Sequence, residues 1–273
     1  MSEFSSSFIL IGERLNTHRE RFRAAVAERN AEVVFRETRR QIKAGATHLD
    51  LNTSGDSARE TADMLWMLET MLPETPDDVG IVIDSADPDC QAAALAKLNG
   101  RAGTIVNSNS ADNERIFKGL ELAAKHNAGA IAILANSAGI SGLATNRVKR
   151  AEELHAWMTN AGIPEERQFF DPQLLPLAFD PQLARTILAT VRELSERWPN
   201  SHILVGLSNV SFNMPRRGLL NQVYLAMLLA NGIDAVICDP CLVPIHETLY
   251  AGQALLGQDE FFATYLSAFM PED

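Results

Sequence analysis

The stretch ILVGLSNVSFN, residues 203–213, indicates how the whole chain folds. It begins as an unbroken apolar run, which is typical of a strand buried on both faces, and it ends abruptly in hydroxyl and amide side chains. Asn209 lies at that junction between Ser208 and Ser211, and its amide both donates and accepts hydrogen bonds. We therefore expect a polar surface where this strand leaves the core.

The rest of the chain repeats the pattern of a short apolar run followed by a helical segment. The repetition predicts an α/β fold, a closed (β/α)8 TIM barrel, as a single domain over residues 8–273; such a barrel typically needs about 250 residues. A doubly wound open sheet is the alternative. The expected strands are 8–11, 48–51, 79–83, 104–106, 128–134, 168–170, 203–206 and 235–237, and the expected helices run through 33–42, then 58–71, 88–98, 114–126, 147–161, 181–198, 219–230 and from about 243 onward.

Composition excludes several classes of partner. The formal net charge is −11 over 273 residues, and nucleic-acid binding needs a dense basic surface. No apolar run approaches the roughly 20 residues that span a bilayer, so we expect no membrane insertion. The first residues, MSEFSSS (1–7), predict a disordered N-terminal tail and no signal peptide. Three cysteines, an odd number, fit a reducing compartment, and we expect a cytoplasmic protein.

Polar side chains follow every expected strand. In a barrel the carboxyl ends of the strands meet at one mouth, where the active site lies. A single aspartate after a strand is commonly a helix N-cap, but a full ring of such residues is harder to explain in that way. None of these ends carries a lysine or a histidine, which argues against Schiff-base chemistry and an imidazole base. The residues are Glu13, Asn16, Asp50, Asn52, Asp84, Asn107, Asn136, Asp171, Asn209 and Asp239.

A ring of carboxylates and amides suits a flat heterocycle with adjacent N–H and carbonyl groups, and a pterin fits that description. A divalent cation held by Asp50, Asp84, Asp171 and Asp239 is the main rival. A second, weaker metal hypothesis rests on the Cys238–Cys241 pair with His246 and Glu247, although a cysteine that ends a buried strand is usually core packing. We expect no metal site.

Seven phrases of the sequence carry a family resemblance. In order and spacing they are similar to the methyltetrahydrofolate:corrinoid methyltransferases, which belong with dihydropteroate synthase to the pterin-binding barrels. The resemblance implies a dihydropteroate-synthase-like barrel and a homodimer. It also implies a folate substrate (methyltetrahydrofolate or tetrahydrofolate) and transfer of the N-5 methyl to or from the cobalt of a separate corrinoid protein. The phrases are IGERLN (11–16), LDLNTS (49–54), IDS (83–85), IVNSNS (105–110), FDPQLLP (170–176), GLSNVSFN (206–213) and LLNQVYLAMLLANGIDAVICD (219–239).

The same resemblance implies a role for individual residues. Asp84, Asn107 and Asp171 correspond to the residues that hydrogen-bond the pterin, and Asn209 to the amide that faces N-5. The chain departs from its relatives at Phe212, where they have a glutamine. Supporting roles fall on Asn16, Asp50, Asn52, Ser208, Arg217 and Asn221, and Arg216 and Arg217 are expected to meet the glutamate tail of folate.

Two alternatives to methyl transfer remain open. Dihydropteroate synthase expels pyrophosphate and its relatives place cationic side chains after the serine of strand seven, whereas Asn209 and Val210 are neutral. A non-catalytic pterin-binding subunit of a larger complex is the second alternative. The chain holds no corrinoid-binding segment of the Asp-x-His-x-x-Gly type, so the cobalt is expected on another protein. The direction of transfer is left undetermined.

Overall fold

The structure is a computed structural model that describes residues 8–108, 113–135, 139, 141–178, 180 and 182–270. The predicted tail at 1–7 and the predicted strand-end residue Asn136 lie outside the described residues. Within this part of the chain, no helix combines the length and apolarity that crossing a membrane requires.

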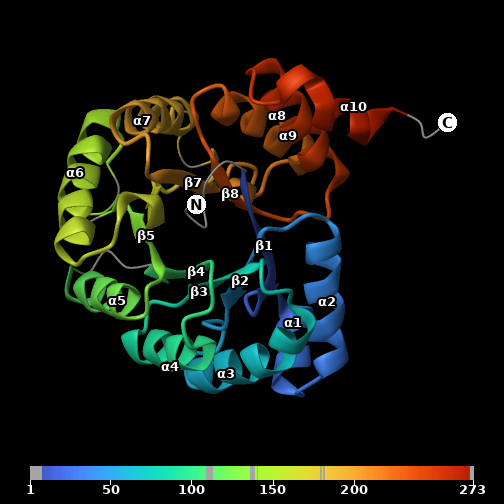
Figure 1. Cartoon of the computed structure of the whole chain (residues 1–273), viewed down its shortest axis with the longest axis vertical. Coiled ribbons are helices and arrows are strands. Elements are labelled where there is room, and N and C mark those ends of the chain that lie inside the picture. The colour runs from blue at the N-terminus through green and yellow to red at the C-terminus, as the bar shows by residue number, and fades with distance from the viewer. Residues whose placement is uncertain are drawn as a thin grey trace.

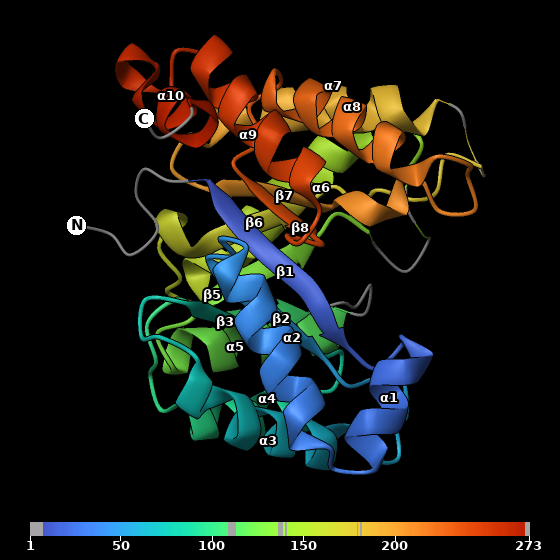
Figure 2. The same ribbon diagram turned by 90° about the vertical axis from the view of Figure 1, so that its right-hand side faces the viewer.

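Eight parallel strands form a closed barrel, in which each strand pairs with the next and β8 pairs with β1 (Figure 1). The closure confirms the predicted barrel and excludes the open doubly wound sheet. β1 extends well beyond its predicted end at residue 11, and Figure 2 shows it crossing between α2 and the group formed by α8, α9 and α10. The strands are β1 Ile9–Asn16, β2 His48–Asn52, β3 Gly80–Asp84, β4 Thr104–Ser108, β5 Gly129–Ile133, β6 Gln168–Asp171, β7 His202–Gly206 and β8 Ala235–Cys238.

Helices surround the barrel in the expected alternation, with small differences at their ends. Two helices, α1 and α2, precede β2, because the chain turns at Arg29 (φ 56°) and Asn30 then caps α2 by accepting from the Val33 N–H at 3.4 Å. The helices are α1 Glu20–Ala27, α2 Ala31–Lys43, α3 Glu60–Met71, α4 Pro88–Leu98, α5 Asn113–Lys125, α6 Ala144–Asn160, α7 Leu183–Arg197, α8 Arg217–Leu229, α9 Val243–Leu255 and α10 Ala263–Phe269; 3-10 turns lie at η1 Leu72–Glu74, η2 Glu165–Arg167, η3 Leu207–Asn209 and η4 Glu260–Phe262.

Two separate apolar clusters hold the fold together, one inside the barrel and one between the barrel and its helices. Alternate side chains of a strand point to opposite faces, so each strand feeds both clusters. The outer cluster contains most of the buried apolar side chains, Trp198 among them, and Trp66 and Trp157 pack against it. The inner cluster consists of Ile9, Ile11, Val82, Ile105, Ile131, Phe169, Leu204 and Ala235.

Two buried histidines lie at the end of the barrel where the strands begin, opposite the mouth. His48 and His202 are the first residues of β2 and β7. His202 bonds Asp234 Oδ2 through Nδ1 at 2.7 Å. Burial, together with nearby His202, lowers the pKa of His48 to about 4. Buried histidines therefore border the inner cluster where the strands begin, and the polar strand ends lie at its other end.

Candidate functional site

Strand register places four polar side chains in one continuous row across the mouth. Asn16 of β1 pairs in register with Asn52 of β2, Asn52 pairs with Asp84 of β3, and Asp84 pairs with Asn107 of β4. Neighbouring strands lie about 4.8 Å apart, so the four residues extend over roughly 14 Å, which is enough to reach across a flat bicyclic ring. Asn52, Asp84 and Asn107 are each less than a tenth exposed. The row therefore lies just above the inner cluster, as the sequence predicted.

Hydrogen bonds inside the row fix some of its polar atoms and leave others available. Asn52 donates from Nδ2 to Asp84 Oδ2 at 2.7 Å, and its Oδ1 accepts from the Ser54 hydroxyl at 2.8 Å. Asp50 Oδ1 and Asn107 Oδ1 are buried and have no hydrogen-bond partner among the described residues. Because an unsatisfied buried polar atom costs about 1–3 kcal/mol, these two oxygens indicate a ligand with N–H donors.

Asp50 is the most deeply buried carboxyl group of the mouth. Burial, the adjacent Asp84 and the nearby Glu13 hold the pKa of Asp50 well above its usual range.

Asp171, at the end of β6, completes the predicted pterin-binding trio on the other side of the mouth. Its Oδ1 accepts from the Gln173 N–H at 2.7 Å. Burial raises the pKa of Asp171 to about 7, although the Gln173 N–H and the Arg147 guanidinium oppose the change and Asp84 adds to it. Arg147 is 1% exposed and donates to the Pro172 carbonyl, so it holds this strand end in place. A basic residue in the first turn of a helix is unfavourable, and that was the one sequence signal for Arg147.

The 3-10 turn η3 carries Ser208 and Asn209 at the end of β7. Asn209 is exposed, and its amide lies back over the end of the strand. This position depends on Gly206, because a Cβ there would lie 3.0 Å from Asn209 Nδ2. Arg217 stabilises the turn by donating to the Ser208 carbonyl at 2.8 Å and to the Ser211 hydroxyl at 3.1 Å.

A cavity of about 390 Å³ opens beside this turn. Phe212 is 49% exposed on its rim, with the Arg217 guanidinium 6.0 Å from the ring centre. Arg217 is one of the lining residues and Arg216 is not. Asn221, predicted to support the site from α8, is 6% exposed, and its Oδ1 has no partner within the described part of the chain. The cavity is lined by Glu13, Arg14, Asn16, Arg19, Ser208, Asn209, Phe212, Arg217 and Asp239.

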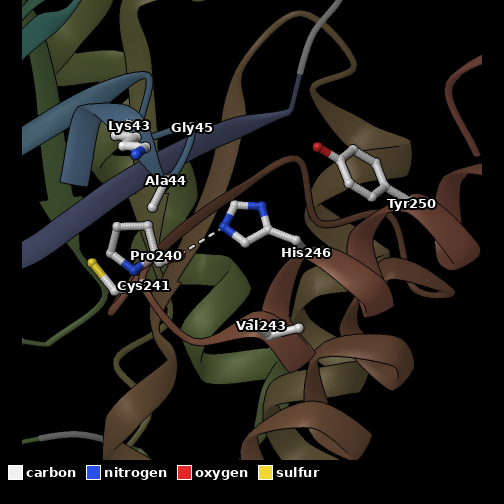
Figure 3. A pocket seen from close by; sticks show the side chains of 8 residues that line it. All are labelled: Lys43, Ala44, Gly45, Pro240, Cys241, Val243, His246 and Tyr250. Atoms are coloured by element: carbon white, nitrogen blue, oxygen red, sulfur yellow. Dashed lines mark hydrogen bonds between the residues drawn. The ribbon is translucent and has the colours of Figure 1, made fainter. Parts of the chain in front are cut away.

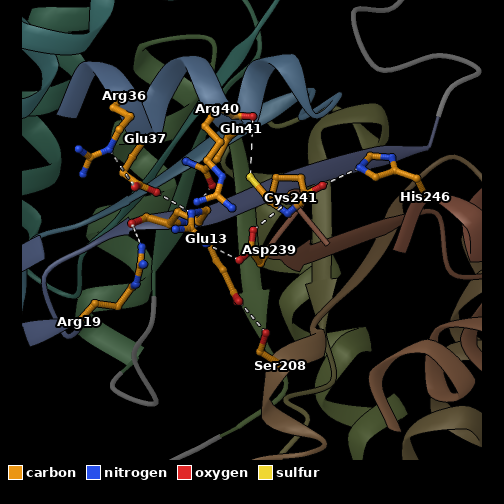
Figure 4. A network of polar contacts seen from close by, with 12 residues as sticks. Glu13, Arg19, Arg36, Glu37, Arg40, Gln41, Ser208, Asp239, Cys241 and His246 are labelled. Carbon is orange, nitrogen blue, oxygen red and sulfur yellow. Dashed lines mark hydrogen bonds and ion pairs between the residues drawn. The ribbon is translucent and has the colours of Figure 1, made fainter. Parts of the chain in front are cut away.

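Glu13, predicted among the strand-end residues of the mouth, takes part in a network of polar contacts beside the cavity (Figure 4). Its neighbour Arg14, for which no role was predicted, connects the cavity to the helix layer. Glu13 Oε1 accepts from the Ser208 hydroxyl at 2.6 Å. Arg14 is held on both sides, by Glu37 Oε2 at 2.6 Å and by Asp239 Oδ2 at 2.5 Å. Asp239, predicted as a mouth residue, is therefore mainly a partner of Arg14.

A second hollow of about 380 Å³ lies outside the barrel, between the end of α2 and the start of α9 (Figure 3). Its polar groups have partners in the protein. His246 Nε2 donates to the Pro240 carbonyl at 2.6 Å, and Cys241 Sγ contacts the Arg40 carbonyl at 3.8 Å. Across the described residues, no group of three or more histidine, cysteine or acidic side chains is arranged to hold a metal ion.

The mouth presents a row of amides and carboxylates above the inner apolar cluster, and such a surface suits a flat heterocycle with N–H and carbonyl groups. The family model described as "Pterin binding enzyme" matches residues 12–239, and the chain belongs to that family. The match spans all the strand-end residues described above.

Two kinds of curated relative resemble the chain. Over 267 residues it is 28% identical to a methylcorrinoid:tetrahydrofolate methyltransferase of Eubacterium limosum, with 96% of each chain covered. It is 29% identical over 243 residues to methionine synthase of Mycobacterium tuberculosis, where it covers 85% of its own length and 20% of the relative. The chain thus corresponds to about a fifth of methionine synthase and to nearly the whole of the first enzyme.

Solved structures support the fold. The dihydropteroate synthase of Yersinia pestis in a complex with a pterine-sulfa conjugate superposes with a TM-score of 0.68 at 17% identity, covering 92% of this chain and 94% of that one. A second structure of the same enzyme gives a TM-score of 0.65 at 18% identity, with the same coverage. At this identity the likeness concerns the barrel alone.

Proposed function

We propose that the chain is a methyltransferase that moves a methyl group between N-5 of tetrahydrofolate and the cobalt of a corrinoid carried by a separate protein. The observation that carries the proposal is the neutral amide of Asn209, exposed on the rim across from the buried row that ends in Asn107. The similarity to the Eubacterium limosum enzyme over 96% of both chains supports it. In this proposal Asp84, Asn107 and Asp171 hold the pterin ring.

The chemistry explains why a neutral amide suits this position. A tertiary amine is a poor leaving group, so the bond from carbon to N-5 breaks only as the nitrogen gains positive character. An N–H donor at Asn209 stabilises the lone pair that develops on N-5, which is a transition-state effect. The buried row contributes by holding the ring in one orientation relative to that donor.

The corrinoid is proposed to arrive on a partner protein. Residues 1–273 contain no corrinoid-binding segment of the Asp-x-His-x-x-Gly type. Asn209 and Arg217 are exposed at the mouth, where a second protein can reach them. The direction of transfer depends on which methylated species is supplied, because the same site serves both directions.

A homodimer is part of the proposal, and α8 offers a surface for it. Leu219, Val223 and Met227 form an exposed stripe along this helix, at 45%, 51% and 44% exposure. Residues 218–231 contain no charged side chain. A contiguous apolar patch of this kind is typical of a protein interface. Sedimentation of the native chain should give twice the monomer mass, and replacing Val223 and Met227 with glutamate should give monomers.

The experiment that tests the function is a transfer assay with the purified chain, methyltetrahydrofolate and reduced cobalamin. We expect the cobalamin spectrum to change to that of the methylated form while tetrahydrofolate accumulates. Folate binding without transfer would identify a pterin-binding subunit instead. Release of pyrophosphate from a pterin diphosphate and p-aminobenzoate would identify a dihydropteroate synthase.

A further inference from the structure

Methyl transfer requires a proton, and Asn209, the residue predicted to face N-5, does not supply it. When the methyl carbon leaves N-5, the electron pair of the C–N bond stays on nitrogen, and the amine product carries one more proton than that nitrogen did before. In the reverse direction the same proton has to be removed. Asn209 polarises N-5 but has no proton to exchange at neutral pH, because an amide is not an acid in this range. A titratable group is therefore needed in the same cavity.

A β-bulge in β1 brings a carboxyl group to that cavity. Gly12 pairs with Leu49 and Leu15 with Leu51, so Glu13 and Arg14 together lie opposite one residue of β2. In a regular strand, residues three apart point to opposite faces, yet Glu13 and Asn16 both line the cavity. The extra residue explains how both do so, since bulges redirect side chains at barrel rims.

The bulge is held by contacts of its residues with α2 and with the loop after β8. Gln41 of α2 is buried and accepts from the Arg14 N–H at 2.9 Å, which satisfies a backbone donor near the bulge. Gln41 fits there because residue 12 is glycine: a Cβ would lie 2.4 Å from Gln41 Oε1. The Arg14 side chain is engaged by Glu37 and Asp239 and turns away from Glu13.

Glu13 is consequently a carboxyl group with one close polar partner. Within the described part of the chain no lysine or arginine forms an ion pair with it, and the Ser208 hydroxyl bonds it at 2.6 Å. The charged groups that face it are Asp239 at the end of β8, Arg217 of α8 and Arg19 before α1. Burial is the strongest influence and raises the pKa of Glu13, with Asp239 acting in the same direction and Ser208, Arg217 and Arg19 against it.

We propose that Glu13 is the group that exchanges the N-5 proton, with Ser208 stabilising the carboxylate. In transfer toward the corrinoid, the O–H bond of Glu13 breaks and an N–H bond forms at N-5. The carboxylate that remains keeps the hydrogen bond from Ser208, whose neighbour Asn209 polarises the same nitrogen. The carboxylate then takes its proton back from solvent through the open cavity. This inference rests on the proposed function.

The test compares the pH dependence of single-turnover transfer to reduced cobalamin in the native chain and in Glu13→Gln. We expect the native rate to fall as pH rises through the pKa of Glu13. The variant should be about 100-fold slower with that dependence removed, since general acid catalysis contributes roughly 100-fold or more. Its dissociation constant for methyltetrahydrofolate should change less than about threefold. Glu13→Asp should keep the pH dependence at a reduced rate.

Two controls separate proton exchange from a structural role. Glu37→Gln removes one partner of Arg14 on the side away from the cavity, and it should leave the shape of the pH profile unchanged. Ser208→Ala removes the donor that stabilises the carboxylate, so the midpoint should move to higher pH; this variant also tests the proposal if Glu13→Gln does not fold.

Three results would overturn the inference. They are an unchanged rate in Glu13→Gln, a slower rate with the native pH dependence, and an unmoved midpoint in Ser208→Ala. Absence of transfer by the native chain at any pH would instead reject the proposed function.

Discussion

The two sides of the barrel mouth are built in different ways. On β1 to β4, the row Asn16, Asn52, Asp84 and Asn107 is set by strand register, and most of it is buried. On the β7 side, Asn209 is exposed on a short turn. A register-fixed surface is preorganised for holding a rigid ligand, whereas a turn on the rim is accessible to a second protein. Under the proposed function, the β1 to β4 side would bind the pterin and the β7 side would take part in the reaction.

The sharpest way to separate the two sides is to remove the amide on the rim. Asn209→Ala should lower turnover about 100-fold, the size of effect seen when one preorganised donor is lost, with a smaller effect on folate affinity. Steady-state kinetics and folate titration measure both quantities. Asn200→Ala, an exposed amide before β7 at the other end of the strand, is the matched control and should retain native turnover. Full activity in Asn209→Ala would show that the rim is not reactive.

Removing a carboxylate from the row should weaken folate binding more than it lowers turnover, which is the opposite of the effect expected for Asn209→Ala. Asp84→Ala deletes a charged acceptor and leaves the Asn52 amide without its partner, so folate affinity should fall about 30-fold, or roughly 2 kcal/mol. Turnover at saturating folate should change less than affinity. Isothermal titration gives the first value and a saturation curve the second. An unchanged dissociation constant would contradict a binding role for the row.

If Asp171 binds the pterin as proposed, folate binding should depend on pH. Its carboxylate is the form that accepts N–H donors, and its pKa is about 7, so affinity should rise up to tenfold per pH unit below 7 and level off above it. Without ligand, the stability of the folded protein should depend on pH in the opposite direction. The folded protein favours the neutral acid, so its contribution to the free energy of unfolding is lost as pH rises from the ordinary value of 3.8 to about 7.

Asp171→Asn provides the check on both trends. The variant should show a flatter dependence of folate affinity on pH and a smaller loss of thermal stability between acid and neutral pH. Titration and thermal melts at matched pH values measure these trends. If the variant kept the native dependence of folate affinity and stability on pH, a group other than Asp171 would be responsible.

The smallest expected effect concerns the backbone beneath the rim amide. Gly206→Ala places a Cβ 3.0 Å from Asn209 Nδ2, so the amide has to shift by a few tenths of an ångström. We expect turnover to fall about fivefold, because displacement by 1 Å costs up to about 100-fold. The folate dissociation constant should stay close to the native value. A larger effect on binding than on turnover would contradict the proposal that the β7 side acts mainly in the reaction.

The strand-borne side of the mouth was predictable from sequence. Asp84 and Asn107 each directly follow an apolar run, and the barrel topology alone places them side by side. The fold was also predictable, because each apolar run is short and buried and is followed by a helix, which is typical of a parallel barrel.

The loop-borne side was only partly predictable. The length of β1 and its bulge depend on contacts with Gln41, which is distant in sequence, so the position of Glu13 did not follow from alternation. The clearance that Gly206 gives to Asn209 depends on a backbone turn that has no periodic signal. Arg147 acts through a carbonyl of another loop, and only the fold brings the two together.

A crystal structure with bound methyltetrahydrofolate tests the central claim most directly. The pterin ring should lie within hydrogen-bonding distance of Asp84, Asn107 and Asp171, with N-5 facing the amide of Asn209. A ring bound elsewhere, or a cation joining these carboxylates in place of the pterin, would contradict it.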